Sequence, residues 1–252
     1  MPLDPVFAVP LWAALPVAFV VTQLANVMTT LYLHRALAHR SVTFRSPFEF
    51  VARVVLWIVT GIDRREWVAV HRKHHVFSDE PDDPHSPIQR GVWNVLFLNV
   101  VYYRREARRD DTLETYAKDI PADRWDRVLF SRSIVGLGLG VGLLWVLFGP
   151  AVAAVAGAVH LVGYIGLSGA VNGFGHWFGR RPHDNLATNL RWLAALTAGE
   201  GMHNEHHHAP RSPRFGRTWW DIGGKLAGVL ARFGLARLHE SGRSGRRETV
   251  AA

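Results

Sequence analysis

Two long windows of this 252-residue chain contain no lysine or arginine, although the chain has 29 of them. The windows are residues 1–33 and 133–171, and the second window also lacks aspartate and glutamate. A soluble protein carries charges over its whole surface, so this distribution argues against a soluble enzyme. Basic residues that avoid apolar stretches and gather between them are typical of a membrane protein whose basic segments face the cytoplasm.

Composition excludes several classes of protein and of metal site. The net charge of +8 alone would suggest nucleic-acid binding, but the segregation of the basic residues predicts that nucleic acid is not a partner. The absence of cysteine excludes disulfide scaffolds, thiolate zinc sites and iron–sulfur clusters. Any bound metal must therefore be held by imidazole or oxygen, and the chain has 14 histidines.

Hydropathy predicts three membrane-spanning helices, and a tight turn at Gly149-Pro150 joins the last two. The predicted spans are residues 6–33, 133–148 and 151–171. His160 falls inside the third span, where a polar ring needs a partner. We expect it to be buried and hydrogen-bonded, with a structural role.

Two apolar segments, 48–62 and 91–103, are too short to span a bilayer and are predicted to be interfacial or buried helices. The alternative for 48–62 is a true span in which Arg53 snorkels to the surface.

The expected fold class is all-α. We predict an integral membrane protein of the bacterial inner membrane, with one domain over 1–240 and the N-terminus outside. Residues 34–132 and 172–240 would form a helical cap on the cytoplasmic side, and 241–252 a disordered tail.

Three histidine clusters are the candidate metal ligands of the sequence. On an α-helix, positions i, i+3 and i+4 share one face, so each HxxHH trio can direct three imidazoles at one small volume. The HxxxxH pair lies about 140° apart on an ideal helix. Its rings converge only where the helix ends or distorts, unless each serves a different metal. The clusters are His34 and His39; His71, His74 and His75; and His203, His206 and His207.

Eight clustered imidazoles exceed what one metal ion can use, so the count indicates two metals. His208 is five residues from His203 and points away from the shared face, so we exclude it. Metal-bound histidines usually donate their other N–H to a carboxylate or carbonyl. Carboxylates that flank the clusters are Asp79, Glu80, Asp82, Asp83, Glu200 and Glu205.

Four stretches resemble a known family, the membrane acyl-CoA/acyl-lipid desaturases of the stearoyl-CoA desaturase-like group. Three look like its histidine boxes: LHRALAHRSVTF (33–44), EWVAVHRKHHVFSDEPDDPHSP (66–87) and GEGMHNEHHHAPRS (199–212). The fourth, VNGFGHWFGRRPHD (171–184), looks like the link between the last span and the third box. The resemblance covers roughly residues 20–240, with the motifs in the family's order.

The resemblance implies a centre of two iron ions bound by nine histidines and by a water that Asn172 holds. The implied ligands are His34, His39, His71, His74, His75, His176, His203, His206 and His207. Behind them we expect His85, Asp83 and Glu200 to hold the ligand rings. The sequence departs from the family in having only 33 residues before the first box, where four spans are usual, and in carrying His208.

The resemblance also implies the activity: O2-dependent insertion of a cis double bond into a saturated fatty acyl chain, carried by CoA or by a membrane lipid. The di-iron centre would do the chemistry without a separate side-chain acid or base. Two electrons would come from a ferredoxin-, rubredoxin- or cytochrome b5-like donor with its reductase. Trp67, Trp177 and Trp192 lie next to the boxes and are predicted to line the acyl tunnel, with interfacial anchoring as the alternative.

Two competing functions follow from the same residues. A di-iron lipid hydroxylase or ketolase shares the first hydrogen abstraction. A histidine-rich metal transporter is disfavoured, because its ligands belong within the spans rather than at or beyond their ends.

Overall fold

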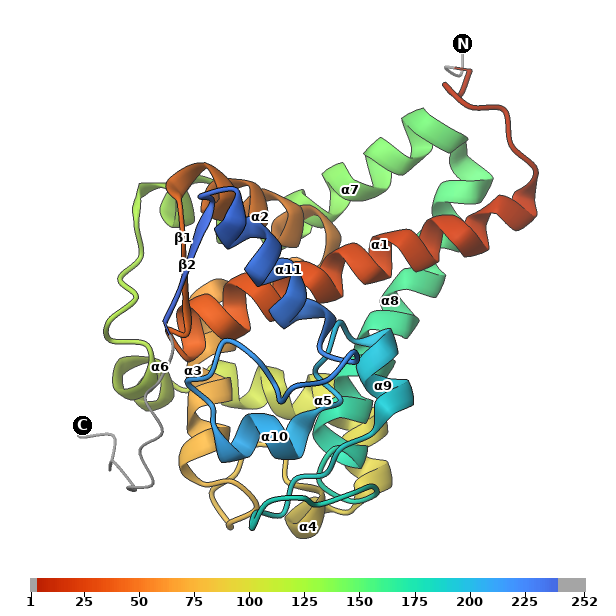
Figure 1. Ribbon diagram of the computed structural model, residues 1–252. Coiled ribbons are helices and arrows are strands. Elements are labelled where there is room, and N and C mark those ends of the chain that lie inside the picture. The colour runs from red at the N-terminus through yellow and green to blue at the C-terminus, as the bar shows by residue number, and fades with distance from the viewer. Residues whose placement is uncertain (1–3, 240–252) are drawn as a thin grey trace.

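The computed structural model describes residues 4–239, and most of them are helical. An extended bundle projects from one end of the molecule (Figure 1). It contains α1 (Ala14–Met28), α7 (Ser133–Phe148) and α8 (Pro150–Phe174). The other helices gather at the opposite end: α2 (Ser46–Val59), α3 (Arg64–Val76), α4 (Pro87–Arg90), α5 (Val92–Ala107), α6 (Asp110–Tyr116), η3 (Asp126–Phe130), α9 (Arg191–Leu196), α10 (His203–His208) and α11 (Ile222–Arg232).

The first apolar helix is longer at its far end than the sequence predicted. A 3₁₀ turn, η1 (Leu11–Ala13), leads into α1, and a π-helix, η2 (Thr29–Ala38), continues α1 without a break. Among the described residues, Leu11–Ala38 and Pro150–Phe174 are long and apolar enough to cross a membrane. Ser133–Phe148 is apolar but has only 16 residues. The helix thus runs from 11 to 38 rather than from 6 to 33, because the π-helix carries it into the first histidine box.

The turn between α7 and α8 is as predicted. Gly149 has a φ of 85°, which favours glycine, and Pro150 occupies the first position of α8. The hairpin places α8 against α1, where small side chains let the two backbones approach closely. The residues at this contact are Ala14, Ala18, Val152 and Ala156.

His160 is buried and fully hydrogen-bonded, as expected. One ring nitrogen lies 3.0 Å from the Thr22 hydroxyl of α1, and the other lies 2.7 Å from the Val59 carbonyl of α2. These bonds join three helices, so the polar ring is a structural cross-link within the bundle.

The predicted all-helical fold misses a small antiparallel sheet, β1 (Val42–Phe44) with β2 (Ala236–Leu238). Val42 and Phe44 point into the core while Thr43 faces outward, the alternation expected of a half-buried strand. Three residues are too few for this pattern to be recognised within a helical sequence. The sheet brings the last described residues beside the first histidine box.

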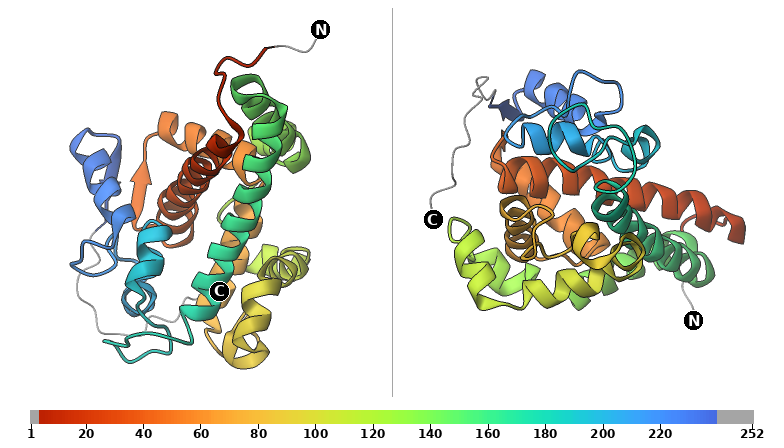
Figure 2. Two further views of the ribbon diagram at one scale, coloured as in Figure 1. Left: turned by 90° about the vertical axis from the view of Figure 1, so that its right-hand side faces the viewer. Right: turned by 90° about the horizontal axis from the view of Figure 1, so that it is seen from below.

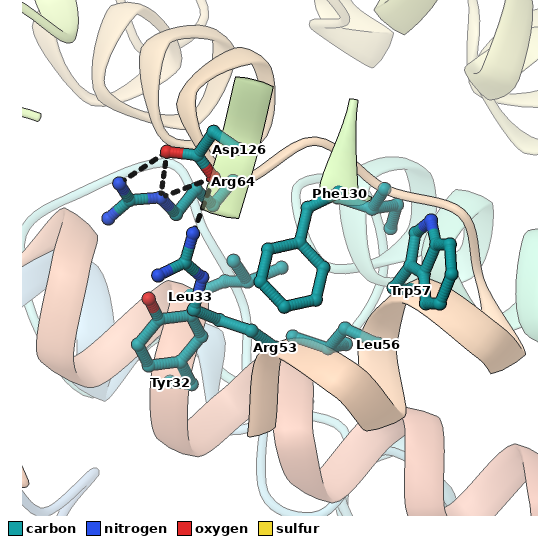
Figure 3. A pocket seen from close by; sticks show the side chains of 9 residues that line it. Tyr32, Leu33, Arg53, Leu56, Trp57, Arg64, Asp126 and Phe130 are labelled. Atoms are coloured by element: carbon teal, nitrogen blue, oxygen red, sulfur yellow. Dashed lines mark hydrogen bonds and ion pairs between the residues drawn. The ribbon is translucent and has the colours of Figure 1, made fainter. Parts of the chain in front are cut away.

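Arg53 forms ion pairs with residues of the protein, which differs from the alternative in which 48–62 spans the membrane and Arg53 snorkels to the surface. Its guanidinium donates to Asp123 at 2.7 Å and to Asp126 at 2.7 Å, and Arg64 also binds Asp126. Figure 3 shows Arg53, Arg64 and Asp126 around a small cavity beside Tyr32. The 14-residue α2 is therefore fixed to η3 and lies across the end of the bundle.

Candidate metal centre

The π-helix decides how the first histidine box is arranged. Its hydrogen bonds run from residue i+5 to residue i, so residues five apart are stacked one turn above each other. The His39 N–H donates to the His34 carbonyl at 3.1 Å, and the two ring centroids are 4.9 Å apart. The distortion that the HxxxxH spacing requires is therefore present, and both rings face the same volume.

Nine histidines converge into two neighbouring groups. Within each group one ring nitrogen per histidine lies within 4.8 Å of all the others. The two groups touch, since the rings of His75 and His207 stack 4.3 Å apart. Group one contains His34, His39, His71, His75 and His206; group two contains His74, His176, His203 and His207.

Each HxxHH trio is divided between the groups, which differs from the single shared volume that the sequence suggested. His71 and His75 belong to group one, whereas His74, between them on α3, belongs to group two. On α10, His206 likewise faces group one. Three residues on one helical face still cover an arc of about 100°, enough to serve two adjacent sites.

Three carboxylates hold ligand rings by their Nδ1 atoms. The distances are 2.6 Å from His34 to Glu200, 2.9 Å from His74 to Asp83 and 2.7 Å from His176 to Asp79. The first two carboxylates were predicted from sequence, and Asp79 was one of six candidates. A ring that donates Nδ1–H to a carboxylate presents the lone pair of Nε2 to the centre of its group.

Glycines explain how Glu200 reaches His34. Gly199 has a φ of 110°, and a Cβ on Gly201 would lie only 2.3 Å from the backbone nitrogen of Ala194. A side chain at either position is strained or clashes, so the turn requires the sequence Gly-Glu-Gly. The turn is further fixed because the Gly223 N–H donates to the Ala198 carbonyl at 2.7 Å.

The electrostatics of the groups suit a cation. Burial, and then the neighbouring imidazoles, lower the pKa of six ligand histidines far below the usual value, so these rings are neutral at pH 7. They are His39, His71, His75, His203, His206 and His207. Burial alone would raise the pKa of the three carboxyls, but their histidine partners hold those pKa values below the usual range.

The ring nitrogens that converge in each group cannot all be hydrogen-bonded to one another. His34 Nε2 lies 3.0 Å from His206 Nε2, and His74 Nε2 lies 3.3 Å from His207 Nε2. Because the Nδ1–H groups of His34 and His74 donate to carboxylates, the Nε2 atom of each ring in its neutral form is an acceptor. His176 Nε2 is buried in group two with no hydrogen-bond partner. Neutral imidazoles with inward lone pairs are a donor set that fits a divalent metal.

Asn172 lies on α8, four residues before His176, which follows the end of that helix. Its amide N–H donates to the Asn99 side-chain oxygen at 2.9 Å, and Asn99 in turn donates to the Ser168 hydroxyl at 3.1 Å. This chain fixes the orientation of the amide and leaves the Asn172 side-chain oxygen available as an acceptor. The resemblance to the desaturases indicated Asn172, but nothing in the sequence pointed to Asn99.

Comparison with known proteins assigns the chain to a family. The fatty acid desaturase family model matches residues 10–224, which is most of the chain. The chain belongs to the fatty acid desaturase family. The match includes all nine histidines of the two groups, so family membership and site geometry point to the same residues.

Individual relatives are similar over most of the chain. An acyl-CoA C20 Delta5-desaturase of Anemone leveillei is 36% identical over 84% of this chain and 68% of its own length. An sn-1 stearoyl-lipid 9-desaturase of Synechocystis is 29% identical over 84% of this chain. A hex-5-enoyl-[acyl-carrier protein] acetylenase of Moorena producens is 30% identical over 81% of this chain and 69% of its own length. The chain spans 66% of the Synechocystis relative, about two thirds of its length.

Family membership identifies the chain as a fatty acyl desaturase, an oxidoreductase. The hydroxylase alternative is not favoured, since these relatives are named for unsaturating acyl chains. The ligand groups also lie at the ends of the long helices and beyond them, as argued against a transporter.

The other residues that the sequence singled out around the centre differ in whether they contact a ligand ring. His85 is buried and stacks on His74 at 4.6 Å, although neither of its ring nitrogens has a partner. Burial lowers the pKa of His85 to about 3. Trp67 stacks on His71 at 4.8 Å, whereas Trp177 and Trp192 are 44% and 51% exposed. His208 stacks on His183 outside both groups, as its exclusion predicted.

Proposed function

We propose that the desaturase holds two iron ions, one in each histidine group, and uses O2 to insert a cis double bond into a fatty acyl chain. The observation that carries this proposal is the division of nine convergent imidazoles into two touching groups of five and four. Asn172 would supply group two with its missing ligand through a water. Its fixed amide and its position four residues before His176 support that role.

The irons would supply the oxidising power that an unactivated methylene requires, because no side chain can remove hydrogen from such a carbon. The chain's own residues orient and insulate the centre. Glu200, Asp83 and Asp79 fix three ligand rings through their Nδ1 atoms. Phe215 packs against His34 and His206, and Trp67 against His71, so apolar rings exclude water from group one.

Two methylene hydrogens leave with two electrons, and two more electrons must come from a donor for O2 to be reduced fully to water. We propose a separate ferredoxin-, rubredoxin- or cytochrome b5-like donor with its reductase. The names of the relatives include a lipid, CoA and an acyl-carrier protein as carriers, so the acyl chain is their common substrate. For this desaturase we propose acyl-CoA or membrane acyl lipid.

The two long apolar helices and the family make this a membrane protein. We propose that α7 completes a set of three spans within one domain over 1–240, in the bacterial inner membrane. The histidine groups would then lie in a cap on the cytoplasmic side, where basic residues are concentrated. The predicted disordered tail, 241–252, lies outside the described residues. Trp67, Trp177 and Trp192 remain our candidates for the wall of the acyl tunnel.

The deciding experiment is gas chromatography–mass spectrometry of total fatty acids from the source organism. Strains with the gene deleted, restored, and restored with His74→Ala or His208→Ala would be compared. We expect one unsaturated species to disappear on deletion, and to return with the native gene and with His208→Ala but not with His74→Ala. A profile unchanged by deletion, in a strain without a second desaturase, would refute the proposal. Loss of a hydroxylated lipid instead would identify a hydroxylase.

A further inference from the structure

We propose that α11 is an in-plane membrane anchor whose outer surface binds anionic phospholipid headgroups. This goes beyond the proposed reaction, in which α11 has no part. The proposal rests on three features of the segment from Arg214 to Arg237: its depth along the first apolar helix, an apolar outer stripe and an unbalanced charge.

The depth of α11 follows from what its inner face contacts. Leu226, Ala227 and Leu230 pack in one apolar cluster with Val27 and Leu31 of the first helix. A span needs about 20 residues at 1.5 Å each, so a span that begins at Leu11 reaches the other side of the hydrocarbon near residue 30. The inner face of α11 therefore lies at the membrane–water boundary, and the views in Figures 1 and 2 place α11 beside the first helix.

The outer face of α11 is apolar and unpartnered among the described residues. Ile222, Val229 and Phe233 follow at i, i+7 and i+11, which places them within about 40° of each other on a helix. They are 37%, 45% and 78% exposed, and Trp219, just before the helix, is 85% exposed. An apolar stripe at this depth, with tryptophan at one end and phenylalanine at the other, matches an interfacial helix.

The charge of the segment is complementary to an anionic surface. Between His207 and His239 the only acidic residue is Asp221, and it is buried in an ion pair with Arg35 at 2.6 Å. The Nζ atom of Lys225 lies 3.8 Å from the ring centroid of Trp219, which places an ammonium group at the tryptophan end of the stripe. The exposed cations around the stripe are Arg214, Arg217, Lys225, Arg232 and Arg237.

Lipid explains both properties of this face together. A second copy of the chain would present the same cations to each other across the contact, and like charges there are unfavourable. A membrane offers hydrocarbon for the stripe and phosphates for the cations at the depth where the helix lies.

The anchor connects the membrane surface to the metal centre. Asp221 caps α11 by accepting from the Gly224 N–H at 2.9 Å, and it binds Arg35, the neighbour of His34. Gly223 donates to Ala198, next to the turn that holds Glu200. A lipid-bound α11 therefore braces the first and third boxes from the membrane side.

The absence of cysteine makes a direct test simple. Nitroxide labels on Val229→Cys or Phe233→Cys would be compared with Val162→Cys on α8 and with Asp184→Cys, an exposed position in the loop between α8 and α9. The full chain would be held in nanodiscs of phosphatidylcholine, with or without phosphatidylglycerol. Power saturation with O2 and with a polar nickel chelate then gives the depth of each label.

We expect the labels at 229 and 233 to favour O2 over nickel and to lie roughly 5–10 Å below the headgroups, deeper with phosphatidylglycerol. Charge removal in Arg217→Gln/Lys225→Gln/Arg232→Gln should abolish the effect of phosphatidylglycerol. Nickel access equal to that at Asp184→Cys would overturn the proposal, and so would protection from both reagents, which would mean that a protein covers the face. Ile222→Cys provides an independent position if either variant misfolds.

Discussion

The two histidine groups have the same chemistry but differ in how completely they surround their centres. Group one has five imidazoles and one carboxylate behind them, that of Glu200. Group two has four imidazoles and two carboxylates, those of Asp79 and Asp83. The hydrogen-bonded chain of Asn172, Asn99 and Ser168 begins four residues before His176, a ligand of this group. The comparison teaches that group two has fewer imidazole ligands and depends more on side chains outside the boxes.

The strongest test of this comparison uses two adjacent histidines that serve different groups. His75→Ala removes a ligand from group one and His74→Ala a ligand from group two. We expect each to lower desaturation by more than about 100-fold, since even residues behind metal ligands cost 10–100-fold. Iron per chain, measured by mass spectrometry, should fall from about two to about one in both variants, because each group binds its own ion.

His208→Ala is the control for both variants, because this neighbouring histidine lies outside the groups. Full iron content in either ligand variant would break the assignment of one ion to each group.

The next effect separates the carboxylates of the two groups. Asp83→Asn leaves the Nδ1–H of His74 with a weaker acceptor, and Glu200→Gln does the same for His34. We expect each change to lower activity about 10–100-fold, with group two losing its metal first in Asp83→Asn. Asp82→Asn is the matched control, since that neighbouring carboxylate is exposed. Equal activity of Asp82→Asn and Asp83→Asn would contradict the ring-holding role.

A smaller effect is expected for the polar chain beside group two. Asn99→Leu removes the acceptor that orients the Asn172 amide, so the water position of group two should be weakened. We expect activity to fall about tenfold, at the lower end for groups that orient metal ligands, with little change at group one. Asn94→Ala is the control, because the side chain of Asn94, also on α5, donates to the Arg90 carbonyl of α4 instead. An unchanged rate in Asn99→Leu would argue against a role for Asn172.

The smallest effect concerns stability rather than the metals. Hydrogen bonds from Arg53 lower the pKa of Asp123, and although burial opposes it, the hydrogen bond from Arg64 lowers that of Asp126. Because both pKa values are depressed on folding, their contribution is present above about pH 4 and is lost as the pH falls further. Asp123 is 40% exposed, so Asp123→Asn should remove only about 0.5–1 kcal/mol.

Thermal unfolding in nanodiscs between pH 6 and pH 3 would measure this contribution. We expect the native chain to lose more stability over that range than Asp123→Asn, with iron content equal at pH 7. A matching loss in both would exclude a role for this ion pair in acid stability.

Much of the site could be predicted because histidines that bind one metal centre from the same helix recur at fixed spacings in the sequence. The trios His71/His74/His75 and His203/His206/His207 were evident from helical periodicity, and Glu200 from its position beside a box. His176 has no neighbouring histidine in sequence, so only the resemblance to a family indicated it. The division into two groups depends on how α3, α8 and α10 are oriented together, which no single segment encodes.

The fold was predictable to a similar extent and for a similar reason. Apolar length identified the helices α7 and α8 and their turn at Gly149, because these are local properties. The pairing of Arg53 with Asp123 joins residues 70 positions apart, and the β1–β2 contact joins Thr43 with Arg237. Such contacts form only after the helices have packed, so periodicity carries no signal for them.

The π-helix at Thr29–Ala38 has a consequence for how this chain can change in length. Removing one residue between Thr29 and Leu33 would allow ordinary i→i+4 bonds to form. Because a wide i→i+5 turn accommodates one extra residue, His34 would keep nearly the same direction relative to the bilayer segment before it. A one-residue deletion there is therefore expected to leave this metal ligand in place, whereas a one-residue insertion would turn His34 by about 100° away from its group. The first helix can therefore lose one residue before His34 more easily than it can gain one.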